Sequence, residues 1–272
     1  MSDSEMAARL IMLGTGSAFP KHSYNSCFII KSNDFTLLSD AGGGNGIFER
    51  LERVGITPSD LTHFIISHAH TDHILGAVWI VRARINLAKS GKELPRLQIY
   101  ANQATASALI EICRLTFLDS YFSMIEDIAD IHVINPPSHI AVGNASIDFF
   151  DVMSENVDQL GFRLTFTAGL SVVSLGDEAL TPQNHEAAQN ADYLICGAFC
   201  RYADRDIFNP YEKHHLTVKD VAETAQTCGI KHLILYHSED STTGKQEKYA
   251  DEASAYFSGE VTIPADLDII DI

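Results

Sequence analysis

The chain of 272 residues is long enough for one large α/β domain or two smaller ones. Hydrophobic residues make up 46% of it and charged residues 20%, a balance that excludes a disordered, collagen-like or coiled-coil protein. Nineteen basic residues against 36 acidic ones give a formal net charge of −17, so we expect no bulk electrostatic affinity for long RNA or DNA.

Short apolar runs alternate with amphipathic segments along the chain, which is typical of an α/β protein. In the first half we expect strands at 8–14, 26–31, 35–39, 62–67, 97–101 and near 131–135, and helices at 45–55, 74–89 and about 103–115. In the second half we expect strands at 145–151, 161–166, 170–175, 192–196 and 232–236, and helices at 182–190 and 217–228. Because no Gly/Ser/Pro-rich linker or charge run divides the chain, the pattern predicts a single layered α/β domain over 1–272.

The N-terminal segment and the cysteines indicate a reducing compartment. The sequence MSDSEMAARL has acidic residues before its one Arg and lacks the apolar core of a secretory signal. No run approaches the 18 apolar residues of a membrane span, and the five cysteines are odd in number and scattered. We therefore expect a cytoplasmic protein with reduced thiols and no membrane partner.

A dense cluster of potential metal ligands, His68-Ala69-His70-Thr71-Asp72-His73, follows the strand expected at 62–67. Residues two apart in an extended segment lie on the same side, so His68 and His70 can bind one ion. Asp72 and His73 begin the next helix and can bind a second ion. Two cations roughly 3.5–4 Å apart lower the pKa of a shared water and hold an attacked phosphoryl or carbonyl oxygen, so the cluster indicates hydrolysis.

The pattern H-x-H-x-D-H resembles the signature of the metallo-β-lactamase superfamily. Gly14-Thr15-Gly16-Ser17-Ala18 with Pro20, and Leu38-Ser39-Asp40-Ala41-Gly42, look like the N-terminal signature of its ribonuclease Z and phosphodiesterase branch. His215-Leu216-Thr217 matches the H-x-T segment of that branch. The resemblance implies a four-layer αββα sandwich with a dinuclear metal site.

The resemblance also implies which residues bind the two ions. The segments Gly161-Phe162-Arg163-Leu164 and Ser174-Leu175-Gly176-Asp177 resemble paired strands that end at a bridging Asp, and His237 resembles the last ligand. These matches assign His68 and His70 to the first ion, Asp72, His73 and His237 to the second, and Asp177 to the bridge. Zinc is the expected metal, with manganese or iron as alternatives.

One departure from the family concerns the third ligand of the first ion. Family members carry a His about six residues before the Gly-Phe-Arg strand, and the same count from Gly161 reaches Glu155. No histidine occurs between His139 and His185. We therefore expect Glu155 to be a ligand, and an oxygen donor there shifts metal preference from zinc towards iron or manganese.

Two further departures concern the proton donor and the substrate. Ile195-Cys196-Gly197-Ala198 stands where the branch has His-Glu-Ala-Thr, so Gly197 cannot orient His215 as a general acid, and the adjacent His214 is an alternative donor. Residues 100–150 hold no Gly/Pro-rich arm of the kind that tRNA-processing enzymes carry.

These observations together predict a metal-dependent hydrolase in which a metal-bound hydroxide attacks a small phosphodiester, with Asp72 and His215 as catalytic residues. A lactone or ester hydrolase would use the same chemistry. A diiron redox enzyme would use Glu155 as a ligand, and a binding protein with a decayed site would hold no metal. The expected partner is a small-molecule substrate, and a homodimer is expected by family analogy alone.

Overall fold

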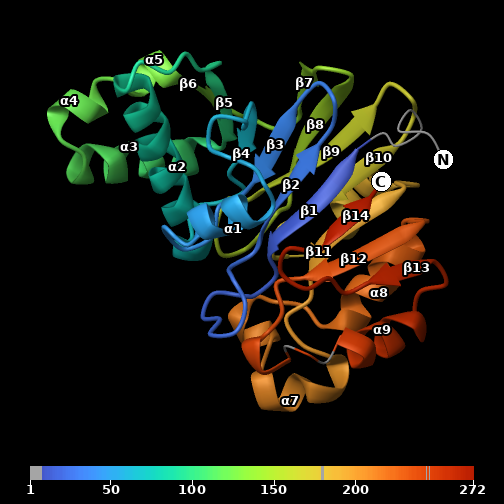
Figure 1. Cartoon of the computed structure of the whole chain (residues 1–272). Coiled ribbons are helices and arrows are strands. Elements are labelled where there is room, and N and C mark those ends of the chain that lie inside the picture. Colours follow the sequence, from blue (N-terminus) through green and yellow to red (C-terminus); the bar gives the residue numbers. More distant parts are fainter. Residues whose placement is uncertain (1–7, 179–180, 243, 245) are drawn as a thin grey trace. The chain divides into compact units, whose positions relative to one another are not determined.

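The computed structural model describes residues 8–178, 181–242, 244 and 246–272 (Figure 1). Backbone contacts divide the chain into two compact units, each of which contains a seven-stranded mixed sheet within the described residues. Unit 1 comprises Met1–Gly14, Tyr24–Asn135 and Asp266–Ile272, and unit 2 comprises Thr15–Ser23 and Pro136–Ala265. The single domain expected over 1–272 stays a prediction.

The sheet of unit 1 has the strand order β14-β1-β2-β3-β4-β5-β6. Its strands are β1 (Arg9–Gly14), β2 (Cys27–Lys31), β3 (Thr36–Ser39), β4 (His63–Ile65), β5 (Leu97–Ala101), β6 (Ala129–Val133) and β14 (Ile269–Asp271). Strands β3 to β6 are mutually parallel, while β14, β1, β2 and β3 are joined by antiparallel pairs. The parallel strands therefore end at one edge of this sheet, where loops carrying polar side chains begin.

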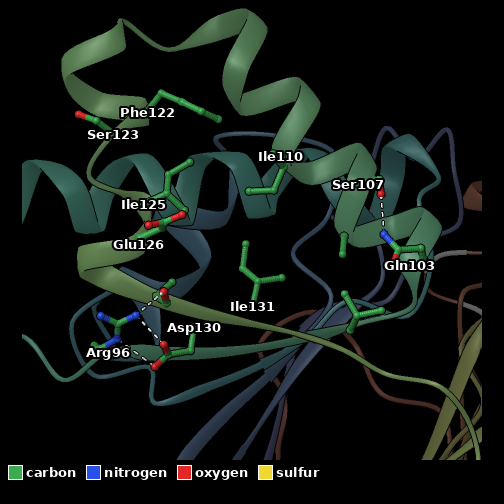
Figure 2. Close-up of a pocket in the computed structure, with 13 residues that line it drawn as sticks. Arg96, Gln103, Ser107, Ile110, Phe122, Ser123, Ile125, Glu126, Asp130 and Ile131 are labelled. Atoms are coloured by element: carbon green, nitrogen blue, oxygen red, sulfur yellow. Dashed lines mark hydrogen bonds and ion pairs between the residues drawn. The ribbon is translucent and has the colours of Figure 1, made fainter.

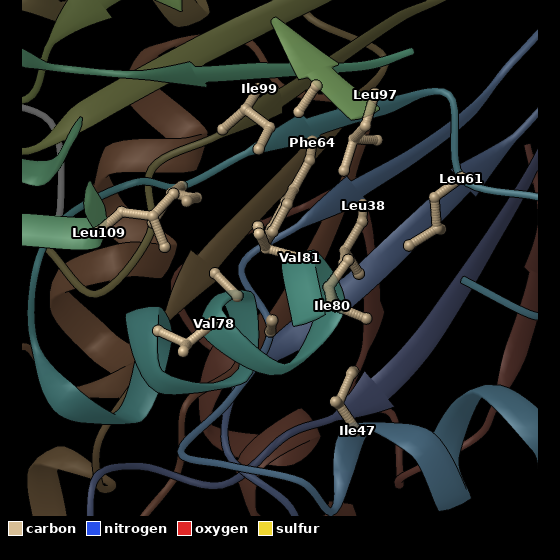
Figure 3. Close-up of a cluster of buried hydrophobic side chains, with 14 of the residues drawn as sticks. Leu38, Ile47, Leu61, Phe64, Val78, Ile80, Val81, Leu97, Ile99 and Leu109 are labelled. Atoms are coloured by element: carbon tan, nitrogen blue, oxygen red, sulfur yellow. The ribbon is translucent and has the colours of Figure 1, made fainter. Parts of the chain in front are cut away.

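Helices α1 (Ile47–Arg53), α2 (Thr71–Lys89) and α3 (Gln103–Thr116) share a hydrophobic core with one face of this sheet (Figure 3). Alternate residues of the strands, such as Leu38, Phe64 and Ile99, are buried against Ile80 and Val81 of α2. The short helices α4 (Asp119–Phe122) and α5 (Ile125–Ile128) lead from α3 into β6.

Arg84 fastens the middle of α2 to two neighbouring loops. Its side chain is fully buried, and Nη1 donates hydrogen bonds to the carbonyl oxygens of Pro58 (2.7 Å) and Leu61 (3.2 Å), while Nη2 donates to that of Pro95. Burial lowers the pKa of the guanidinium to about 10. Three carbonyl oxygens thus satisfy the buried guanidinium and join the middle of α2 to the segments that precede β4 and β5.

The sheet of unit 2 has the strand order β13-β12-β11-β10-β9-β8-β7. Its strands are β7 (Ser138–Val142), β8 (Ala145–Asp151), β9 (Leu160–Phe166), β10 (Ser171–Ser174), β11 (Tyr193–Gly197), β12 (His232–Tyr236) and β13 (Glu260–Thr262). Strands β10 to β13 are parallel, and β7 to β10 are antiparallel. This sheet therefore also has an edge at which several parallel strands end together.

Helices α6 (His185–Ala188), α7 (Arg205–Phe208), α8 (Val218–Thr227) and α9 (Gln246–Ser254) belong to unit 2. Val218, Val221 and Ala222 of α8 are buried in one cluster with Leu194 and Leu233 of the sheet. A capping box begins α8, in which the side chain of Thr217 accepts from the backbone of Asp220 and Asp220 accepts from the Thr217 backbone.

The strands and helices expected from the sequence are present, together with further short elements in both halves of the chain. Strands β7, β13 and β14 and helices α4, α5, α7 and α9 were not expected. The segment expected as a helix at 182–190 is a 3₁₀ turn at Pro182–Asn184 followed by α6. The five cysteines, all in the described part of the chain, are buried free thiols as expected. Among the described residues, no helix is both long and apolar enough to span a membrane.

Candidate metal centre

The histidine cluster of unit 1 lies where the parallel strands β3 and β4 end. Asp40 follows β3 directly, its N–H donates to the carbonyl of Ile65 (2.9 Å), and its backbone adopts a left-handed conformation with φ 55°. The chain after β4 continues through His68 to His70, the N-cap of α2, so Asp72 and His73 form the first turn of that helix. A left-handed non-glycine residue costs energy, and such conformations concentrate at functional sites.

The carboxylate of Asp40 orients two histidines of the cluster. Its Oδ2 accepts a hydrogen bond from Nδ1 of His73 at 2.8 Å and another from the hydroxyl of Ser67 at 2.7 Å. Since the Ser67 hydroxyl hydrogen is given to Asp40, its oxygen accepts from Nδ1 of His68, 2.9 Å away. Both imidazoles therefore carry their proton on Nδ1, and the lone pair of Nε2 points away from Asp40 and Ser67. Metal-binding histidines that are oriented by a carboxylate adopt this tautomer.

The remaining donor atoms of the cluster come in close pairs. Nε2 of His68 lies 3.0 Å from Nδ1 of His70, and Nε2 of His73 lies 3.3 Å from Oδ2 of Asp72. Bonds of about 2.0–2.1 Å to one tetrahedral ion would separate two donors by roughly 3.3 Å. His68, Asp72 and His73 are buried and His70 is exposed, so one side of the cluster faces solvent.

Unit 2 contributes a second donor set, at the ends of the parallel strands β10 and β12, which flank β11 in the sheet. Asp177 follows β10 and His237 follows β12, and Nδ1 of His237 lies 3.1 Å from Oδ1 of Asp177. Both side chains are buried, at 5% and 1% exposure. His237, like Asp40, has a left-handed backbone, with φ 53°.

Gly197, at the end of β11 between these two strands, lets the backbone of Asp177 approach closely. A Cβ atom at this position would lie 2.8 Å from the carbonyl oxygen of Asp177, and the N–H of Gly197 donates to the carbonyl of Gly176 at 3.0 Å. Any side chain at this position would therefore require the backbone of Asp177 to shift.

His215 lies beside His237, with a distance of 5.1 Å between ring centroids. The ring of His215 stacks on Phe199, with 5.0 Å between the ring centroids. The N–H of Phe199 also donates to the carbonyl of Leu216, so the segment that carries His215 is fixed next to the end of β11. His214 is exposed and takes a left-handed conformation with φ 58°. Of the two histidines considered as proton donors, His215 is thus the one in contact with the Asp177–His237 pair.

Glu155 lies in the segment between β8 and β9 and is exposed. Its neighbour Ser154 donates to a carboxylate oxygen of Glu178 at 2.5 Å. The close donor pairs described above do not include Glu155, and its role as a ligand stays a prediction.

The donor chemistry of both sets fits a divalent transition-metal ion. Imidazole nitrogens and carboxylate oxygens are the ligands that zinc and its first-row neighbours take in hydrolytic sites. The buried carboxylates of Asp40, Asp72 and Asp177 also favour positive charge nearby, since buried anions are otherwise costly.

A cavity of about 660 Å³ in unit 1 lies apart from this chemistry, among α3, α5 and β6 (Figure 2). Its described lining includes Ile110, Phe122 and Ile131 and contains neither histidine nor cysteine. The carboxylate of Asp130 there is held by Arg96, with Oδ2 2.9 Å from Nε. The described lining of this cavity therefore lacks the imidazole donors that characterise the site at the strand ends.

The orienting roles of Asp40 and Ser67 do not follow from the sequence pattern. Asp40 belongs to the segment Leu38–Gly42, but its contacts with Ser67 and His73 join residues 27 and 33 positions apart. The position of Asp40 in the sequence does indicate a functional role. It is an acidic residue directly after an apolar strand, and that strand is parallel to the one that precedes the histidines.

Comparisons with known proteins connect this site to a family. A curated relative, the ribonuclease Z of Streptomyces coelicolor, is 24% identical over 301 residues, covering 95% of each chain. The metallo-β-lactamase fold protein YhfI from Bacillus subtilis superposes with a TM-score of 0.78 at 22% identity, covering 98% of this chain and 99% of that one. A diphosphatase of the PhnP family superposes with a TM-score of 0.75 at 18% identity, covering 97% and 96%.

The chain thus has the metallo-β-lactamase fold and resembles the ribonuclease Z branch, which confirms the α/β fold class expected from the histidine motif. The relatives also support the expectation of a metal-dependent hydrolase. One family model matches residues 8–252, nearly the whole chain. The protein therefore belongs to the family described as Anti-Pycsar protein Apyc1.

Proposed function

We propose that this protein is a metal-dependent phosphodiesterase that cleaves a small phosphodiester, and that the donor sets of the two units together bind two divalent ions. The observation that carries the proposal is the spacing of three donor pairs at 3.0, 3.1 and 3.3 Å. Within these pairs unit 1 supplies four donor residues and unit 2 supplies two, and Glu155 of unit 2 is a third proposed ligand from that unit. Since each ion needs about four ligands, neither set by itself is sufficient for two ions.

The assignment of ligands is the one that the resemblance to the metallo-β-lactamase superfamily implies, and the three donor pairs are consistent with it. His68 and His70 bind the first ion, with Glu155 as its further ligand. Asp72, His73 and His237 would hold the second, and Asp177 would be shared by the two. When bound, two such ions supply Lewis acidity at the phosphoryl oxygen and an activated water.

Three further roles in the reaction belong to side chains of the protein. Asp40 holds His73 and, through Ser67, His68 in the tautomer that binds metal. Asp72 would orient the water that attacks the phosphorus. His215, packed between Phe199 and His237, donates a proton to the leaving oxygen.

A small substrate is favoured over long RNA by the net charge of −17, because a polyanion is repelled by such a surface. The likeness to a ribonuclease and to a diphosphatase supports a phosphoryl ester over a lactone. Zinc is the first choice of metal, with manganese and iron as alternatives.

The proposal is tested with protein that has been stripped of metal by a chelator and then supplied with zinc, manganese or iron. We expect hydrolysis of bis(p-nitrophenyl) phosphate to vanish on stripping and to return with the metal. Equal or better turnover of a lactone, or no turnover of any phosphodiester, would contradict the proposed substrate class.

The role of His215 is tested with two leaving groups. His215→Ala should lower kcat about 10²- to 10⁴-fold for a dialkyl phosphodiester, because an alkoxide needs a proton as it leaves. The same variant should retain most of its rate with a p-nitrophenyl ester, whose leaving group departs as the anion. His214→Ala is the matched control and should leave both rates unchanged.

A further inference from the structure

The loop at residues 15–23 of unit 2 is fixed at both ends by the segment that follows His237. At its start, the N–H of Ser17 donates to the carbonyl of Ser238 at 3.0 Å, and the N–H of Ser238 donates to the carbonyl of Thr15 at 3.1 Å. At its end, Asp240 holds two successive residues. Together these contacts place the loop directly beside the proposed metal ligand.

We call the contacts at the two ends of the loop its anchors, and the second anchor is the carboxylate of Asp240 alone. Oδ1 of Asp240 accepts the N–H groups of Lys21 and His22, both at 2.8 Å, and Oδ2 accepts from Nδ1 of His22 at 2.7 Å. Although burial opposes it, these donors hold the pKa of the Asp240 carboxyl below its usual value, so the anchor is charged at neutral pH.

Between the two anchors the loop presents Phe19 to solvent. The ring is 92% exposed, whereas Thr15 and Ser17 just before it are 8% and 6% exposed. Pro20 follows and restricts the backbone of Phe19 to extended conformations. Single exposed apolar residues are ordinary, but an aromatic ring whose backbone is already held loses little entropy when it binds.

The position of Phe19 relative to His237 is limited by the chain itself. Ser17 pairs with the residue after His237, and two residues extend at most about 7 Å. A phosphodiester held at His237 can therefore extend its ester group to the ring of Phe19, provided that this group is about as long as a nucleoside.

We propose that Phe19 is a specificity-determining residue, which stacks on an aromatic ring carried by the substrate. This inference rests on the proposed phosphodiesterase function. Stacking between an aromatic side chain and a base tolerates many ring types, so Phe19 selects for an aromatic ester group and not for one particular base.

The test compares two esters that share a leaving group, thymidine 5′-(p-nitrophenyl) phosphate and ethyl p-nitrophenyl phosphate. Phe19→Ala should lower kcat/KM for the thymidine ester about ten-fold, mainly through KM, and change that for the ethyl ester less than two-fold. Phe19→Trp should restore the preference. Ile207→Ala, which removes another exposed apolar side chain of unit 2, is the control and should change neither value.

Equal losses with both esters, or no loss with either, would overturn the assignment. Equal losses accompanied by a change in molecular mass on size-exclusion chromatography would show that Phe19 contacts a second copy of the chain, which also overturns it.

A binding measurement separates this inference from the proposed function. The chain has one tryptophan, Trp79, so the double variant Phe19→Trp with Trp79→Phe carries a single fluorescent reporter in the loop. Thymidine monophosphate should quench this reporter and inorganic phosphate should not, whether or not either ester is hydrolysed. Absence of quenching by the nucleotide would contradict the stacking role, even in an active enzyme.

Discussion

Asp40 and His73 are joined by a hydrogen bond of 2.8 Å from Nδ1 of the imidazole to Oδ2 of the carboxylate. The same oxygen holds the hydroxyl of Ser67, and through it the imidazole of His68. One buried carboxylate, 2% exposed, thus sets the tautomer of two proposed ligands without being a ligand itself.

Replacing this carboxylate should weaken metal binding while the ligands stay in place. We expect Asp40→Ala to lower zinc affinity about 10- to 100-fold, the usual effect of losing an orienting partner. A competition titration with a chromophoric chelator measures it. Asp130→Ala, which removes an acid of the same unit that is paired with Arg96, is the matched control. Unchanged affinity in Asp40→Ala would refute the orienting role.

Gly197 supports the position of Asp177, because a Cβ atom there would lie 2.8 Å from the Asp177 carbonyl oxygen. Gly197→Ala should therefore lower the free energy of unfolding by about 1–3 kcal/mol, the usual cost of overpacking, and should also weaken metal binding. Urea denaturation and metal titration measure the two effects. Gly44→Ala, at a position with open space around it, is the control. A stable Gly197→Ala variant with normal metal affinity would argue against this packing role.

Glu155 is the ligand prediction with least support from its surroundings, since its side chain is exposed. If it binds the first ion, Glu155→Ala should release that ion, and Glu155→His should raise zinc affinity and shift the activity profile to lower pH, because imidazole adds less negative charge. Elemental analysis of both variants decides it. Unchanged metal stoichiometry in Glu155→Ala would leave His68 and His70 without this further ligand.

His63 should make the protein less stable in acid. Burial, with a smaller contribution from His132, lowers its pKa to about 4. An unfolded chain binds a proton at a pKa near 6.5, so the unfolded state gains protons first and stability falls as the pH drops from about 6.5 towards 4. His63→Phe, which can keep the stacking on Tyr100, should flatten this part of the profile.

Urea midpoints measured at successive pH values test this prediction. His139→Phe provides a surface control, because it removes an exposed histidine and leaves the stacking of His63 on Tyr100 in place. An equally steep slope in His63→Phe would contradict the assignment.

The strands that carry the site can be predicted from the sequence, because each is a short apolar run with clear ends and is buried in the structure. Strand β5 spans Leu97–Ala101 and β12 spans His232–Tyr236, as expected. Helix α2 begins at Thr71, three residues before the start that apolar periodicity indicates, and its first turn includes Asp72 and His73, as expected from the ligand cluster.

Elements that depend on distant partners could not be predicted. Strand β14 has only three residues, and it exists because Ile269–Asp271 pairs with β1 at the other end of the chain. The roles of Asp40 and Gly197 likewise arise from contacts with residues about 20 to 33 positions away. The histidine motif, by contrast, lies within six residues, so spacing alone indicated metal binding.

The central claim, that the two donor sets together bind two divalent ions, is tested most directly by the metal-to-protein ratio. The protein is purified without a metal-affinity tag, supplied with zinc, freed of excess metal and analysed for metal content. We predict two ions per chain, fewer than two in His73→Ala and in His237→Ala, and two in the control His139→Ala. A ratio of one or less in the unmodified protein, or a ratio of two that neither variant lowers, would contradict the account.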